Sequence, residues 1–129
     1  MALQFHDTAH NARLDAIETV LGPAPLLTLC SGPPPANCQA PNAGTVLVVM
    51  ALPSDWMAAA ALGAKTINGP WSGVATADGI AAHFRIHDST GTECGIQGTV
   101  GEGSGDMQID NTEIIAGQSL NVPVFTIRD

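Results

Sequence analysis

Two histidines, His83 and His87, stand four residues apart and have side chains that could bind a metal ion or move a proton. They fall in a segment where Phe84 and Ile86 alternate with polar residues, and a period of two is typical of a β-strand. On a strand, residues four apart share a face but lie about 13 Å from each other, at roughly 3.3 Å per residue. Two imidazoles at that distance cannot share one ion, because Zn–N bonds are only about 2 Å long. We therefore expect both histidines on the solvent side of a strand, without a metal.

Three cysteines, Cys30, Cys38 and Cys94, are the second group that could do chemistry. None forms a Cys-x-x-Cys pair, so neither a zinc knuckle nor a thioredoxin-type site is indicated. Three arrangements stay open. In the first arrangement all three thiols are reduced, which is the state that synthesis in a cytoplasm favours. Alternatively, one internal pair forms, with a disulfide between Cys30 and Cys38 closing a proline-rich loop, or the cysteines form disulfides to neighbouring chains.

The remaining chemical motifs are incomplete. Asp106, Asp110 and Glu113 carry carboxylates of the kind that bind calcium, but strand alternation separates them, and we expect them to be solvated. The glycine run at 101–105 precedes no predicted helix, so it lacks the context of a dinucleotide-binding loop. Neither a Gly-x-Ser-x-Gly elbow nor a Walker loop occurs. We therefore predict no catalytic residue, no cofactor and no enzyme activity.

One amphipathic helix is predicted near the start of the chain, over residues 8–21. Asp7 or Thr8 can cap it, and Gly22 followed by proline is a strong stop signal. Its apolar stripe needs a surface to cover, because a helix of about 14 residues is marginal alone. The stripe packs either across the protein's own sheet or on a neighbouring subunit, and it consists of Leu14, Ile17 and Leu21.

The rest of the chain predicts a mainly β fold. The segment 80–100 indicates a hairpin with a polar turn at 88–92, and short apolar runs elsewhere are separated by turn signals every eight to twelve residues. Residues 26–30 and 45–52 are the clearest further strands, whereas 54–61 favours either a helical turn or an irregular crossing segment. We expect an antiparallel β-sandwich of about seven to nine short strands over residues 23–129, preceded by an N-terminal helical segment over 1–22.

A long proline-rich loop joins the first two strands. It includes the triple proline at Pro33, Pro34 and Pro35, which favours a stiff polyproline II segment. Loops of this length are uncommon in small domains unless they contact something. The loop is therefore a candidate interface, although an ordered surface loop without a task remains the alternative.

Composition narrows the class of partner. The chain has 129 residues, 12 acidic against 4 basic side chains, and a formal net charge of −8. Nucleic-acid binding depends mainly on Lys and Arg, so it is not expected. No apolar run of about 18 residues occurs, so no membrane span is expected, and the first residues do not resemble a secretory signal. The acidic surface favours either solubility or docking on a basic partner.

Several segments together give a resemblance. The chain resembles the small virion structural proteins of tailed bacteriophages, which are variously labelled capsid decoration, neck or collar, and minor tail components. The hairpin pattern Phe-Arg-Ile-x-Asp-x-x-Gly and the pattern Asn-Thr-x-Ile-x-x-Gly before the final strand contribute to it. The segments that carry it are NARLDAIETVLGPAP, LLTLCSGPPPANC, GTVLVVMALPSDWM, GIAAHFRIHDSTGT, QGTVG, DMQIDNTEIIAGQSLNV and VFTIRD. The three cysteines and the triple proline depart from the commoner pattern.

The resemblance implies a structural role with no active site to transfer. It implies a virion protein made in the host bacterial cytoplasm, in the form of a minor capsid or decoration subunit. A neck, collar or tail subunit is the alternative. The implied partners are the major capsid protein or other virion proteins, and we expect a homo-oligomer. From another class, a carbohydrate- or ligand-binding domain would use Trp56 and Trp71 as stacking platforms, although core or interface anchors are the usual role of such residues.

Overall fold

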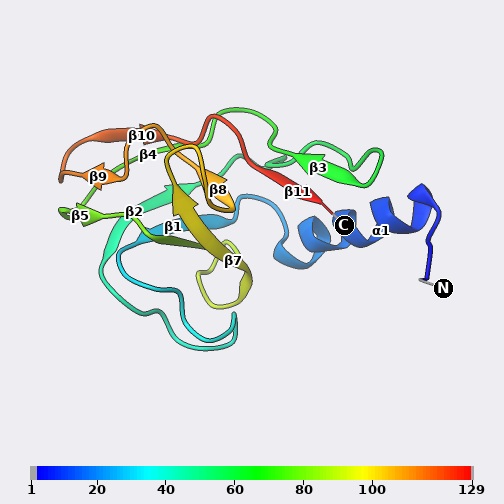
Figure 1. Cartoon of the computed structure of the whole chain (residues 1–129), viewed down its shortest axis with the longest axis horizontal. Coiled ribbons are helices and arrows are strands. Elements are labelled where there is room, and N and C mark those ends of the chain that lie inside the picture. The colour runs from blue at the N-terminus through cyan, green and yellow to red at the C-terminus, as the bar shows by residue number, and fades with distance from the viewer. Residues whose placement is uncertain (1–2, 129) are drawn as a thin grey trace.

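The computed structural model describes residues 3–128 and is mainly β (Figure 1). Within these residues one helix, α1 (Asp7–Leu21), precedes the strands, which confirms a β-rich fold with an N-terminal helix. Residues 3–128 contain eleven short strands, more than the seven to nine predicted, because several expected strands are broken into two-residue or three-residue pieces. They are β1 (Leu26–Cys30), β2 (Val46–Ala51), β3 (Ala64–Thr66), β4 (Ser72–Val74), β5 (Gly79–Ile80), β6 (His83–His87), β7 (Cys94–Gly101), β8 (Met107–Gln108), β9 (Glu113–Ile114), β10 (Ser119–Asn121) and β11 (Thr126–Arg128).

The largest sheet has five strands in the order β2-β1-β6-β7-β8. Three two-stranded sheets, β10-β4, β11-β3 and β5-β9, complete the described strand pairing. All pairs are antiparallel except β7 and β8, which run parallel. The expectation of purely antiparallel pairing is therefore wrong at this one place. Between β7 and β8 the chain makes a complete loop through a glycine-rich segment, in which Gly103 and Gly105 adopt positive φ. After this loop β8 lies beside the end of β7 and runs in the same direction.

The register of β1 on β6 divides the large sheet into two faces. Leu27 lies opposite Ile86, and Leu29 lies opposite Phe84. Because paired residues point to the same side of a sheet, these side chains form one face, which we call the apolar face. The alternate positions form the other face, which we call the polar face. Leu26 lies on it opposite His87, and its other members include Thr28, Cys30, His83, Arg85, His87 and Gln97.

The apolar face supports the hydrophobic core. Phe84 packs edge-to-face on Phe125 at 5.3 Å between ring centroids, and Phe125 in turn contacts Trp71 at 5.8 Å. Trp56 lies 6.0 Å from Trp71, and both indole rings are fully buried. The glycine at position 98 leaves room for Phe84, since a Cβ there would lie 2.8 Å from Phe84 Cε1. The interruption that makes β7 a weak strand in sequence is therefore required by the packing of the core.

Helix α1 packs within its own chain. Leu14 and Leu21 are each 3% exposed, so two of the three residues proposed for an interface are buried by the rest of this chain, and only Ile17 is partly open. The end of the helix lies against β7, where a Cβ at Gly95 would be 2.5 Å from Leu21 Cδ2. Lys65 of β3 fixes the middle of the helix through ion pairs. The intramolecular alternative for the stripe is thus the one that the structure contains.

One local prediction about the helix needs correction, and the structure also decides between the two alternatives for residues 54–61. The N-cap is His6, whose Nδ1 accepts a hydrogen bond from the Thr8 amide at 3.1 Å, and not Asp7 or Thr8, because the helix begins at Asp7. The end at Gly22 is confirmed, with φ of 74°. Residues 54–61 form no helix and instead cross the molecule as an irregular segment, which was the second alternative.

Candidate functional site

The polar face is covered by residues 31–45, which we call the covering loop. In Figure 1 this loop runs along the lower edge of the view, away from β4 and β10. As a result every residue of β6 is buried, including both histidines: His83 is 0% and His87 is 8% exposed. The prediction of surface histidines is therefore wrong. The strand alternation was correct, but the polar side faces a loop and not solvent.

Carbonyl groups of the covering loop accept hydrogen bonds from the polar face. His83 Nδ1 donates to the Gly32 carbonyl at 2.8 Å, and Gln97 Nε2 donates to the Pro35 carbonyl at 2.9 Å. Proline residues supply carbonyl acceptors without an N–H, so a proline-rich loop has an excess of acceptors. Side chains rich in donors are the natural complement of such a loop.

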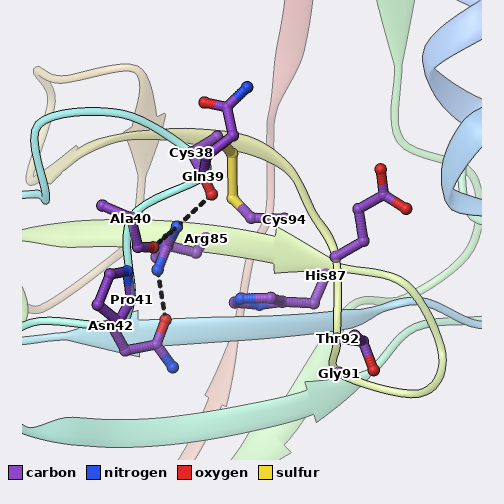
Figure 2. Close-up of a pocket in the computed structure, with 11 residues that line it drawn as sticks. Cys38, Gln39, Ala40, Pro41, Asn42, Arg85, His87, Gly91, Thr92 and Cys94 are labelled. Carbon is purple, nitrogen blue, oxygen red and sulfur yellow. Dashed lines mark hydrogen bonds between the residues drawn. A yellow bond between two sulfur atoms is a disulfide. The ribbon is translucent and has the colours of Figure 1, made fainter.

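Arg85 is the centre of this arrangement. Its side chain is 1% exposed, and its guanidinium donates to Asn42 Oδ1 at 2.6 Å (Figure 2). The same guanidinium donates through Nη2 to the carbonyls of Cys38 at 2.7 Å and Ala40 at 2.8 Å. Three charge-assisted hydrogen bonds from one rigid fork hold the loop segment 38–42 in place. Sequence analysis did not identify this role for Arg85.

A disulfide between Cys38 and Cys94 closes the same region, with Cα atoms 5.4 Å apart and a sequence separation of 56. Cys30 remains a free, buried thiol. The expectation of three reduced thiols is therefore wrong, and so is the pairing of Cys30 with Cys38. Cys30 points into the polar face beside His83, whereas Cys38 lies over the start of β7. No cysteine is left with an exposed thiol for a neighbouring chain.

A hollow of about 640 Å³ opens between the covering loop and the turn after β6. Arg85 and His87 line it from the sheet, and the disulfide lies at its edge (Figure 2). The walls are residues 38–42 and 91–94. The hollow is therefore built from β6, β7, the loop and the turn together, and polar groups make up much of its lining.

The electrostatics of the hollow follow from burial beside a fixed cation. Burial lowers the pKa of His87, the charge of Arg85 lowers it further, and Asp88 opposes both. Burial raises the pKa of the Cys30 thiol, which Arg85 partly offsets. Hydrogen bonds from the Thr90 hydroxyl and the Thr92 amide lower the pKa of Asp88. At neutral pH His87 is thus uncharged, Cys30 is a thiol, and Asp88 is an ionised carboxylate committed to its own turn.

The acidic residues that were considered as calcium ligands, and expected to be solvated, do not come together. Asp106, Asp110 and Glu113 are all exposed, as expected for solvated acids. Asp106 Oδ2 accepts hydrogen bonds from the amide and the hydroxyl of Thr99, which gives it a structural role at the end of β7. Among residues 3–128 no group of three His, Cys, Asp or Glu side chains is placed to hold a metal ion.

We compared the chain with known protein families, with curated proteins and with solved structures. None of the three comparisons finds a match. In the part of the chain that the structure describes, no helix has both the length and the apolar character needed to cross a membrane. A functional assignment therefore rests on the residues themselves and on the resemblance that they carry in sequence.

Proposed function

We propose that this chain is a structural protein of a bacteriophage virion, namely a minor capsid or decoration subunit. Its function would be to stabilise the particle through contacts with the major capsid protein or other virion proteins. It would act as a homo-oligomer. Two things support this proposal. One is the sequence resemblance, and the other is the way in which the covering loop is held.

The observation that carries the proposal is a stiff, exposed loop segment with many anchors. Pro33 and Pro34 are exposed, and Pro35 is half-buried. The loop around them is fixed by the disulfide, by the guanidinium fork and by the hydrogen bonds of the polar face. At its base the Ser31 amide donates to the Thr45 carbonyl at 3.0 Å. The prolines are therefore presented on a segment that has little conformational freedom.

Such an arrangement favours association between proteins. Binding normally costs the entropy of ordering loops and side chains, and a preorganised surface avoids part of that cost. Proline-rich segments also offer a rigid apolar surface with exposed carbonyls, which suits docking in a groove of a partner. The proline segment at residues 33–35 is accordingly our proposed contact with the partner.

The charge distribution supports a basic partner. Two of the four basic residues, Lys65 and Arg85, are 1% exposed each and do not act at the surface. The exposed surface is thus more acidic than the sequence alone suggests. A positively charged face on the partner would be attracted to it at long range, with an effect that salt weakens.

We also propose that the strands form a sandwich. In such a sandwich the apolar face of the five-stranded sheet would face residues of β4, β10 and the C-terminal segment, which would act as the second layer. Trp71, Leu120 and Phe125 belong to the same hydrophobic cluster as Leu27 and Phe84, as expected for two layers that share one core.

A neck, collar or tail subunit is the alternative within the same class, since the same loop would serve there. The ligand-binding alternative loses the stacking platforms that the sequence suggested. Trp56 and Trp71 are both 0% exposed, and their indole N–H groups donate to the carbonyls of Gly22 and Trp56. They are core residues and are not available to a sugar.

Mass spectrometry of purified particles, from the phage whose genome encodes the chain, tests the proposal. We expect the protein at a fixed copy number. A matched pair of variants then tests the loop: Pro34→Glu should lower incorporation into particles, whereas Pro123→Glu, at another exposed proline, should not. Absence of the wild-type protein from particles would refute the virion role, and equal incorporation of both variants would refute the loop as the contact.

A further inference from the structure

The two buried cationic side chains among the described residues, Lys65 and Arg85, differ in the groups that they contact. Lys65 forms ion pairs with Asp15 at 2.6 Å and with Glu18 at 2.8 Å. Arg85 is buried to the same extent, but its hydrogen-bond partners are two carbonyls and the Asn42 amide oxygen. Among the described residues no Asp or Glu forms an ion pair with it. Arg85 therefore carries a buried positive charge without a counter-charge.

An uncompensated buried charge is costly. The effective penalty for burying one ion is several kcal/mol, and neutral acceptors recover only part of it. The guanidinium also has donor capacity left, because Arg85 Nε has no hydrogen-bond partner and Nη1 uses one of its two N–H groups. An anion beside Arg85 would supply both the missing charge and the missing acceptors.

The hollow places space where an anion would be needed. Arg85 and His87 line it from β6, and Asn42 lines it from the covering loop. Asn42 turns its Oδ1 toward Arg85, so its Nδ2 remains as a donor at the wall (Figure 2). Cation, imidazole and amide donors thus surround one open space of about 640 Å³.

We propose that this hollow binds a small oxyanion, a carboxylate or phosphate group, on Arg85 with His87 and Asn42 as further donors. This site is independent of the proposed virion role, because it needs only the folded chain. The donors of Arg85 would be its unused N–H groups on Nη1 and Nε, because both N–H groups of Nη2 already donate to the Cys38 and Ala40 carbonyls.

Two carboxylates near the hollow act against an anion. Glu93 lines the rim and is exposed. Asp88 directs Oδ1 into its own turn, where it accepts from Thr90 Oγ1 at 2.7 Å and from the Thr92 amide at 3.0 Å. Glu93 is therefore the group whose removal should strengthen binding, and this gives the test a variant of opposite sign.

The test uses the full-length, disulfide-bonded chain. Sodium phosphate and sodium acetate are titrated separately at constant ionic strength, and the amide and Arg85 Nε–H signals are followed by NMR. We expect at least one of the two anions to shift the Nε–H signal and the signals of residues 38–42 in a saturable manner. The two arms show whether the site prefers phosphate or carboxylate.

Isosteric variants make the result decisive. Asn42→Asp places a carboxylate on Arg85 from within the chain and should weaken anion binding about tenfold or more. Its matched control, Asn121→Asp, adds the same charge at an exposed position of β10 and should leave binding unchanged. Glu93→Gln should tighten binding about threefold. The proposal is overturned if neither anion shifts these signals, or if Asn42→Asp binds as tightly as the control.

Discussion

The two faces of strand β6 are both buried, but by different means. On the apolar face, Phe84 and Ile86 are covered by other apolar side chains, and burial itself is the driving force. On the polar face, His83 and Arg85 of the same strand are covered by the covering loop, which hydrogen bonds and one disulfide hold in position. A strand can therefore be buried on both sides although only one side is hydrophobic.

The difference has a consequence for stability. Burial of apolar surface tolerates small shifts, because it has no direction, whereas a buried hydrogen-bonded group loses its full compensation when its partner is removed. Damage on the apolar face should lower the stability of the whole domain. Damage on the polar face should first release the covering loop. Variants on each face separate these two outcomes.

The largest effect is expected from Phe84→Ala on the apolar face. Truncating a buried phenylalanine removes its transfer free energy and leaves a cavity beside Phe125, which typically costs about 3–5 kcal/mol. Val49→Ala is the control, because Val49 on neighbouring β2 is 47% exposed. Urea denaturation should show a large loss for the first variant and a change within about 0.5 kcal/mol for the second. Equal losses would contradict the assignment of the core.

Removal of the disulfide, by Cys38→Ser together with Cys94→Ser, should have the next largest effect. A cross-link over a sequence separation of 56 restricts the unfolded chain, and native disulfides contribute about 2–4 kcal/mol. Hydrogen exchange should become faster in residues 38–42 before it does so in β1 or β6. Cys30→Ala serves as the control for loss of a sulfur atom elsewhere. Unchanged protection of the loop would show that the disulfide does not hold it.

Sequence analysis predicted the structural features that depend on residues close to one another along the chain. The stop at Gly22, the strand at 26–30 and the alternation around Phe84 are local signals, and all three appear in the structure. The polar face was missed because a solvated polar face and a loop-covered one have the same alternating pattern. Nothing within the strand distinguishes water from a loop that is more than forty residues away in sequence.

The hollow beside Arg85 was not predicted from the sequence, because it too depends on contacts between segments that are far apart in the chain. The pairing of Cys38 with Cys94 depends on how β7 returns beside β6, which spacing alone does not give. One signal was available. Arg85 is one of only four basic residues, it stands between Phe84 and Ile86 in the centre of an alternating strand, and the chain also contains a loop with surplus carbonyl groups. Donors in one segment and acceptors in another indicate a contact between them.

Arg85→Met should cost less than loss of the disulfide, about 2 kcal/mol. The variant removes three charge-assisted hydrogen bonds and leaves the Cys38 and Ala40 carbonyls unpaired, but it also removes a buried charge that has no counter-charge. Arg128→Met, at an exposed position, is the control and should change stability by less than about 0.5 kcal/mol. A stabilised Arg85→Met variant would mean that the buried charge outweighs the three hydrogen bonds.

The smallest effect is the acid sensitivity of the polar face, carried by His87. Its pKa in the folded chain is lowered from 6.5 by burial and by Arg85, so the unfolded chain binds a proton more readily than the folded chain does. Its contribution to stability is therefore present above about pH 6.5 and is lost as the pH falls through the lowered folded-state pKa. Asp15 and Asp88 also have lowered pKa values, but their contribution to stability is lost in a separate pH range, because it falls only as the pH drops below 3.8. Urea denaturation at several pH values between about 7 and 4.5 should show a loss for the wild type that is smaller in His87→Gln. Identical pH profiles would show that the imidazole is as accessible to water in the folded chain as in the unfolded one.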